Sequence, residues 1–309
     1  MMPKPDAETR AVLRDLGDVA PLVEGDPDIA VVRRAYDDVF ARWTAPPASP
    51  TGERWIGNCE LGDGNRALVI EPAEGDPGAP TLVFIHGGGW SLGRAFCYAP
   101  LGRWLCAELG VRVLVPDFPQ APEHTAPAAL TALSEFLVWA SSEFGDSISL
   151  MGDSAGGNLA AVLSNDPPVG VSIKAQALLY PVIDLRPDAN YRSRRRFGKG
   201  RHFLTLDAIV GAAMQYAGDV PPDSPRLTPL LAKDFSATPP TAILVPECDP
   251  LFDEGIAYGH MLGQHGVETK ITIAKGTIHG CASFSGRIPS GEAALIETCR
   301  FLKAETRRS

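Results

Sequence analysis

A serine set between glycines is the feature of this sequence best suited to chemistry. Residues 152–156 read Gly-Asp-Ser-Ala-Gly, and they follow a short apolar run at 147–150. A Gly-x-Ser-x-Gly pentapeptide between a strand and a helix forms a sharp turn that lifts the serine hydroxyl above the end of a sheet. The glycines allow the strand and the helix to close around a strained serine. Ser154 is therefore the candidate nucleophile.

A serine hydroxyl becomes a good nucleophile only when a base takes its proton, and six histidines compete for that role. His260 and His265 fall on a predicted helix, His202 falls in a predicted cap, and His124 precedes another predicted helix. His279 instead lies just past the end of a predicted strand, where the active-site residues of open parallel sheets gather. We therefore expect His279 to be the base.

The base in turn needs a carboxylate that fixes its tautomer and stabilises the imidazolium. The expected chain order of serine, acid and histidine places that acid between Ser154 and His279. Asp249 meets this requirement because it follows a predicted strand that precedes the strand of the histidine. Glu247, Asp253 and Glu254 are close alternatives, although the last two are better placed to cap the following helix. We expect Asp249 to be the carboxylate.

Residues 86–90 read His-Gly-Gly-Gly-Trp and end another predicted strand. Backbone N–H groups without bulky side chains are suited to bind the oxyanion of a tetrahedral intermediate. We assign this role to Gly87 and Gly88, with the N–H of Ala155 as a further donor. A phosphate cradle is disfavoured, because no Gly-x-x-x-x-Gly-Lys-Ser/Thr occurs and no Gly-x-Gly-x-x-Gly opens a dinucleotide-binding unit.

Strands and helices alternate along most of the chain, which predicts an α/β fold with a mostly parallel, doubly wound sheet. The hydrophobic pattern predicts strands at 81–85, 111–116, 147–151, 175–180, 241–246 and 267–274, and helices at 95–109, 128–144, 155–164, 254–265 and 291–303. Two earlier strands, 54–61 and 66–71, form a hairpin through the turn at 62–65.

Two segments interrupt this alternation and are predicted to cover the site as a helical cap. Residues 7–43 suit two amphipathic helices separated by a break at 25–28, and the second segment is predicted to contain a helix at 204–216. The proline-rich linker at 46–50 marks the boundary. We expect a catalytic core at 46–309 and cap elements at 1–45 and 186–226.

Within the cap, the basic run at 191–202 favours a solvated loop, with contact to an anionic ligand as the alternative. Trp90 and Phe203 are candidates for the lining of a substrate pocket, with buried packing as the alternative for each.

Composition limits the classes of partner and compartment. The net charge of −9 argues against nucleic acid as a partner, since phosphate binding needs a basic surface. No apolar run has the length of a signal peptide or of a membrane span, so we expect a cytoplasmic protein without membrane contact. The six cysteines lack Cys-x-x-Cys spacing, which disfavours both a zinc site and a disulfide framework.

Together the motifs resemble the hormone-sensitive-lipase-like carboxylesterases of the α/β-hydrolase fold, in the Gly-Asp-Ser-Ala-Gly branch. The shared motifs are 86–90, Ala-Pro-Glu-His at 121–124, 152–157, Tyr-Pro at 180–181, Asp-Pro-Leu at 249–251, Asp-Glu at 253–254 and His-Gly at 279–280. The resemblance implies a catalytic triad of Ser154, Asp249 and His279 under a helical cap. It also implies small ester substrates with short acyl chains and no cofactor.

Two departures from the family pattern stand out. Asp-Phe-Pro-Gln at 117–120 replaces the usual Asp-Tyr-Arg-Leu, which removes an arginine from the surroundings of Glu123. Cys281 replaces an aromatic residue, which would widen the pocket or expose a thiol.

The sequence leaves three points open. An amidase or arylformamidase would use the same intermediate, and a noncatalytic ligand receptor would share the fold. Formation of a homodimer is not decided either.

Overall fold

The computed structural model describes residues 3–17, 28–57, 66–74 and 78–308. Their centre is an eight-stranded sheet with the order β1-β2-β4-β3-β5-β6-β7-β8. β2 pairs antiparallel with β1 and with β4, and all other neighbours are parallel, which confirms the predicted mostly parallel sheet. The strands are β1 (Thr51–Gly57), β2 (Arg66–Pro72), β3 (Thr81–Ile85), β4 (Arg112–Pro116), β5 (Ile148–Asp153), β6 (Ile173–Leu179), β7 (Thr241–Pro246) and β8 (Thr269–Ala274).

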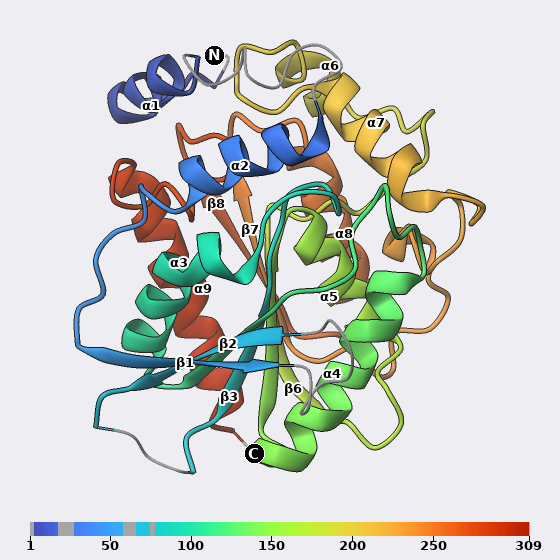
Figure 1. Cartoon of the computed structure of the whole chain (residues 1–309). Coiled ribbons are helices and arrows are strands. Elements are labelled where there is room, and N and C mark those ends of the chain that lie inside the picture. The colour runs from blue at the N-terminus through green and yellow to red at the C-terminus, as the bar shows by residue number, and fades with distance from the viewer. Residues whose placement is uncertain (1–2, 18–27, 58–65, 75–77, 309) are drawn as a thin grey trace.

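Helices cover both faces of the sheet, so the central strands are apolar on both sides (Figure 1). On β3, Leu82 and Phe84 pack into one hydrophobic cluster, while Val83 and Ile85 pack into the other. The first cluster includes α3 (Ala95–Leu109) and α9 (Pro289–Thr306). The second includes α4 (Ala128–Phe144), α5 (Ala155–Asn165) and α8 (Phe252–Gln264).

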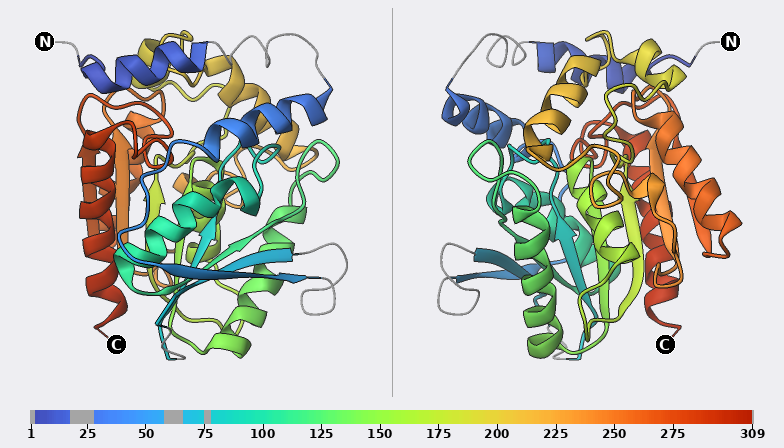
Figure 2. Two further views of the ribbon diagram at one scale, coloured as in Figure 1. Left: turned by 60° about the vertical axis from the view of Figure 1, so that its left-hand side comes forward. Right: turned by 90° about the vertical axis from the view of Figure 1, so that its right-hand side faces the viewer.

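Four more helices gather at one end of the molecule: α1 (Ala7–Gly17), α2 (Ile29–Phe40), α6 (Arg192–Phe197) and α7 (Leu206–Ala217) (Figure 2). They come from the two segments predicted to form the cap. A short 3-10 helix, Pro229–Leu231, follows α7. The predicted turn at 62–65, most of the break at 25–28 and Cys59 lie outside the described residues. None of the described helices has the length and apolar character needed to cross a membrane.

The N-terminal arm, which is the part of residues 1–45 that the structure describes, is bound to segments near the C-terminus. Asp6 donates its N–H to Gly276 O across 2.9 Å and accepts from the Ser290 hydroxyl across 2.6 Å. Further along the arm, the N–H of Ala45 donates to Ser285 Oγ across 3.0 Å. These bonds hold the N-terminal arm against the segment 276–290.

The basic run departs from expectation at Arg194, whereas Arg192, Arg195, Lys199 and Arg201 are exposed, as expected of solvated charges. Residues 192–197 form helix α6 rather than a solvated loop, and the Arg194 side chain within it is only 3% exposed. Its guanidinium pairs with Glu254, whose side chain is fully buried. Arg194 therefore belongs to the packed interior, and the Glu254 carboxylate rather than an external anion balances its charge.

Candidate active site

Ser154 occupies a strained turn between β5 and α5. Its backbone has φ 54° and ψ −118°, a conformation that non-glycine residues rarely adopt. The flanking glycines are required by space: a Cβ on Gly152 would lie 2.3 Å from Gly156 O, and one on Gly156 would lie 2.0 Å from Ile85 O. The turn therefore closes only with glycine at both positions, and it presents the Ser154 side chain at the end of the sheet.

The structure brings Ser154, His279 and Asp249 into one chain of hydrogen bonds. His279 Nε2 lies 2.9 Å from Ser154 Oγ, and His279 Nδ1 lies 2.8 Å from Asp249 Oδ2. The other oxygen of Asp249 accepts the N–H of Leu251 across 2.9 Å, which fixes the carboxylate. Because Asp249 is fully buried and acts only as an acceptor, His279 carries its proton on Nδ1 and leaves Nε2 bare toward the hydroxyl.

The alternative carboxylates are engaged elsewhere. Glu247 accepts the N–H of Gly276 across 3.0 Å. Asp253 accepts the N–H of Ser193 across 2.7 Å, and Glu254 binds the Arg194 guanidinium. The expectation that Asp253 and Glu254 cap α8 is therefore wrong, since both carboxylates bind α6 instead of the N–H groups of their own helix.

The oxyanion loop, residues 86–93, differs from expectation at its first glycine. The N–H of Gly87 donates to Asp153 Oδ1 across 2.6 Å, so it is already used inside the protein. The assignment of Gly87 as an oxyanion donor is therefore wrong. Gly88 and Gly89 border the cavity above Ser154, and within the described residues their N–H groups and that of Ala155 make no hydrogen bond.

Hydrogen bonds to two carbonyl groups of the loop set the direction of the Gly88 and Gly89 N–H groups. His86 Nδ1 donates to Gly87 O across 2.9 Å, and the N–H of Leu92 donates to Gly88 O across 2.8 Å. The C=O and the following N–H of a trans peptide point in opposite directions. His86 and Leu92 hold the carbonyls of Gly87 and Gly88, and the N–H groups of Gly88 and Gly89 therefore point away from these two partners. Burial lowers the pKa of His86, which keeps the ring neutral in this role.

Asp153, the residue before the nucleophile, is a site residue that sequence reasoning missed. Its carboxyl is buried and accepts the Gly87 N–H and the Tyr98 hydroxyl, the latter across 3.2 Å. Burial raises the pKa of Asp153 to about 7, against the opposing effect of the Gly87 N–H. A carboxyl at the second position of a Gly-x-Ser-x-Gly turn is the signal that could have revealed it.

A cavity of about 280 Å³ lies over Ser154 and His279. Its walls are mostly apolar and come from α2, α7 and the segment before α7. Phe203, a predicted pocket residue, lines this cavity and has a positive φ of 74°. The cap elements therefore form the wall opposite the nucleophile.

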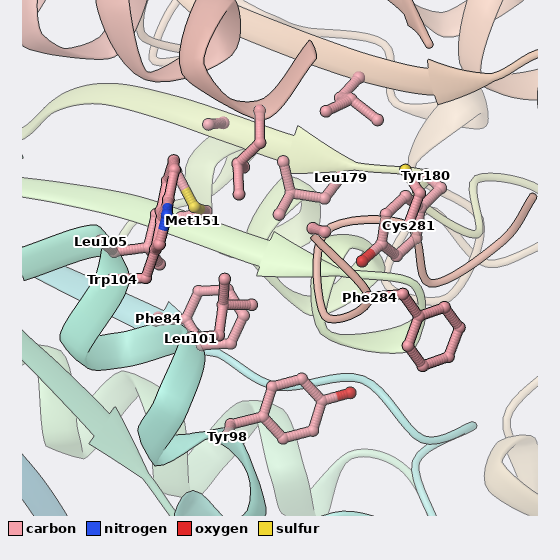
Figure 3. Packing of buried hydrophobic residues seen from close by; sticks show 14 of the residues in the cluster. Phe84, Tyr98, Leu101, Trp104, Leu105, Met151, Leu179, Tyr180, Cys281 and Phe284 are labelled. Carbon is pink, nitrogen blue, oxygen red and sulfur yellow. The ribbon is translucent and has the colours of Figure 1, made fainter. Parts of the chain in front are cut away.

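Trp90 and Cys281, the other two predicted pocket residues, do not line this cavity. The Trp90 ring is buried and stacks on Tyr216, with ring centroids 4.7 Å apart. Cys281 lies in the packed cluster that also contains Tyr98 and Phe284 (Figure 3). Burial raises the pKa of the Cys281 thiol to about 12, so the side chain is neither an exposed thiol nor a widened pocket wall.

Comparisons with known proteins agree with this geometry. Residues 82–283 match a family described as alpha/beta hydrolase fold. The carboxylic ester hydrolase LipN of Mycobacterium tuberculosis is 40% identical over 244 residues, covering 73% of this chain and 64% of LipN. The ethyl acetate hydrolase of Pseudomonas putida is 29% identical over 241 residues, covering 74% of each chain.

Solved structures of esterases share the whole architecture. A hyperthermophilic esterase from Pyrobaculum calidifontis has a TM-score of 0.83 and 29% identity, covering 97% of this chain and 98% of that one. A thermostable esterase from Pseudomonas putida ECU1011 has a TM-score of 0.87 and 25% identity, covering 100% of both chains. The chain therefore belongs to the alpha/beta hydrolase fold family, within the hormone-sensitive-lipase-like group that its motifs resemble.

Proposed function

We propose that this protein is a serine carboxylesterase that hydrolyses esters with short acyl chains through an acyl-enzyme intermediate. The observation that carries the proposal is the unbroken set of hydrogen bonds from Asp249 through His279 to Ser154, beneath a cavity bordered by unused N–H groups. A hydroxyl, a neutral imidazole and a buried carboxylate in this order are the parts that acyl transfer needs.

In the first half of the reaction Ser154 Oγ attacks the ester carbonyl while His279 Nε2 takes the hydroxyl proton. Asp249 keeps the ring in the correct tautomer and stabilises the imidazolium. The carbonyl oxygen becomes an oxyanion that the N–H groups of Gly88, Gly89 and Ala155 bind. The tetrahedral intermediate then breaks its bond to the alcohol oxygen, which leaves with the proton from His279.

In the second half water replaces the alcohol. His279 takes a proton from that water, whose oxygen attacks the acyl carbon and forms a second oxyanion. The bond to Ser154 Oγ breaks, and the serine recovers its proton from His279. A carboxylic acid leaves, and the enzyme returns to its starting state.

The cavity supports a small ester as the substrate. A volume of about 280 Å³ is at the small end of ligand sites, and its mostly apolar lining suits an uncharged acyl chain. The name of the related ethyl acetate hydrolase points to a small ester as well. Cytoplasmic location stays a prediction of the sequence.

Ser154→Ala tests the mechanism. We expect the purified protein to hydrolyse 4-nitrophenyl acetate and butyrate, and the variant to lose this turnover while it keeps the unfolding transition of the wild type. A fluorophosphonate probe should label the wild type at Ser154 and leave the variant unlabelled. Full activity in Ser154→Ala would exclude the proposed nucleophile.

Two further measurements separate the alternatives. Matched ester and anilide substrates with the same acyl group, compared by kcat/KM, distinguish an esterase from an amidase. A burst of nitrophenol equal to the enzyme concentration would show the acyl-enzyme directly, whereas a noncatalytic receptor would show neither burst nor turnover.

A further inference from the structure

The oxyanion loop is held at both ends, with the two free donors between the anchors. At its start, Gly87 donates to Asp153. At its end, the carbonyl of Ser91 accepts Arg33 Nε across 2.9 Å. The donors Gly88 and Gly89 lie between these points, so a shift at either anchor changes where their N–H groups point.

Arg33 reaches this loop from the cap helix α2. Its guanidinium also donates from Nη2 to Ala121 O across 3.1 Å. Two parallel bonds of 2.8 and 2.7 Å, from Nη1 and Nη2, join it to the Glu123 carboxylate. The Arg33 side chain is 25% exposed, so the fork is partly shielded from water. One planar group thus joins α2 to two other segments, the oxyanion loop and residues 121–123, in a single geometry.

Arg33 replaces the arginine that the family motif has near Glu123 and that this chain lacks. Pro119 and Gln120 stand where the family has arginine and leucine, and Glu123 takes its arginine from α2 instead. Gln120 also contributes, because its Nε2 donates to Leu92 O across 3.0 Å and to Gly93 O across 2.8 Å. In this chain the far end of the oxyanion loop therefore depends on the cap.

One turn further along α2, Tyr36 is linked to the other end of the loop through two intermediate side chains. Its hydroxyl lies 2.8 Å from that of Tyr98, which donates to Asp153, the residue that binds Gly87. Positions three apart lie on the same face of a helix, so one surface of α2 binds one anchor directly, through Arg33, and reaches the other through Tyr36, Tyr98 and Asp153. Tyr36 also lines the cavity.

We propose that Arg33 is a positioning residue for catalysis, which holds the oxyanion loop to cap helix α2 and thereby sets the direction of the Gly88 and Gly89 N–H groups. The proposal rests on the esterase function above. Arg33 does not touch the reacting atoms, and its effect falls on the transition state, where the oxyanion exists, rather than on the bound ester.

The test compares Arg33→Ala and Arg33→Lys with a matched control, Arg94→Ala. Arg94 also ties α2 to the core, through Asp37, but its side chain makes no bond to the oxyanion loop within the described residues. For the Arg33 variants we expect kcat on 4-nitrophenyl acetate to fall about ten- to a hundredfold, below the 10²–10³ typical for loss of a donor. KM should change less than about threefold, and Arg94→Ala should keep kcat within about threefold.

A second readout isolates the oxyanion. A trifluoromethyl ketone inhibitor forms a tetrahedral adduct with Ser154 and should lose affinity in the Arg33 variants by the same factor as kcat/KM. The matched methyl ketone, bound without an adduct, should keep its affinity. Arg33→Lys retains the charge and the aliphatic stem, so this variant keeps the test available if Arg33→Ala does not fold.

Equal loss of kcat in the Arg94 and Arg33 variants, or unchanged inhibitor affinity in Arg33→Lys, would overturn the positioning role. The wild type and Ser154→Ala report on the esterase function independently. An active wild type with an inactive Ser154→Ala leaves that function standing whatever the Arg33 variants do.

Discussion

The Arg194 guanidinium and the Glu254 carboxylate form a buried ion pair, with 2.7 Å between Nε and Oε2. The exposed fractions of the two side chains are 3% and 0%. Arg194 also donates to Asp184 O across 2.5 Å, while Glu254 accepts the N–H of Ile183 across 2.8 Å. This pair joins the cap helix α6 to α8 and to the segment after β6.

Arg194→Ala is expected to lower the free energy of unfolding by about 3–5 kcal/mol, because it leaves a buried carboxylate without its partner. Arg195→Ala is the matched control, since Arg195 is exposed on the same helix. That variant should stay within about 0.5 kcal/mol of the wild type. Urea unfolding of the three proteins checks this, and similar stabilities for both variants would refute the structural role of the pair.

Asp249→Asn should lower kcat by about 10³–10⁴, because an amide no longer enforces the tautomer with the proton on His279 Nδ1. Glu247→Gln is its control. The Glu247 side chain binds the Gly276 N–H rather than the histidine, and glutamine retains an oxygen for that bond. We expect Glu247→Gln to keep kcat within about threefold. The reverse pattern would move the carboxylate role to Glu247.

Asp153 predicts how stability depends on pH. Burial raises the pKa of its carboxyl from 3.8 to about 7, so between these values the folded state holds a proton that the unfolded state has released. The free energy of unfolding should therefore fall as pH rises from about 4 to 7, with a contribution of about 4 kcal/mol from this group. Burial raises the pKa values of Tyr36 and Tyr98 well above the usual range, so these neighbours stay protonated throughout.

Asp153→Asn checks this contribution, since the amide resembles the protonated acid and can still accept the Gly87 N–H. The stability of the variant relative to the wild type should increase with pH over the same interval. A difference that is constant between pH 4 and 8 would contradict a raised pKa at this position.

Ala212 on α7 provides a test of the cavity wall. It lines the cavity, and its Cβ would lie 3.1 Å from a Cβ built on Gly89. Ala212→Leu should reduce kcat/KM for 4-nitrophenyl hexanoate relative to the acetate by about tenfold, since filling the wall leaves less room for a long acyl chain. Met214→Leu is the control, because Met214 is 51% exposed on the same helix and does not line the cavity. An unchanged ratio in Ala212→Leu would place the acyl chain against another wall.

The sequence predicted the elements of the core well. Residues 95–109, 128–144, 81–85 and 241–246 form α3, α4, β3 and β7 with the expected bounds. The hydrophobic pattern of these segments follows from regular secondary structure alone. Parallel strands buried on both faces are continuous apolar runs, and the helices between them have apolar residues with a period of 3.6. The alignment of Ser154 with its partners follows from the same pattern, since all three residues follow strand ends.

The details that the sequence missed depend on contacts between distant segments. Arg194 looked like part of a solvated run because its partner Glu254 is 60 residues away. Gly87 was predicted to be an oxyanion donor because its actual acceptor, the Asp153 carboxylate, is 66 residues away in the sequence. Trp90 and Cys281 have side chains that suit a pocket or a core equally well, and only the packing around each one decides.

The fastening of the N-terminal arm has a consequence for how the protein is made on the ribosome. The arm emerges first, yet Ala45 must find Ser285, 240 residues later in the chain. At about 5–20 residues per second, translation leaves the arm without these partners for on the order of 10 to 50 seconds. The cap over the nucleophile is therefore completed only after residues 276–290, which bind the N-terminal arm, have left the ribosome late in translation.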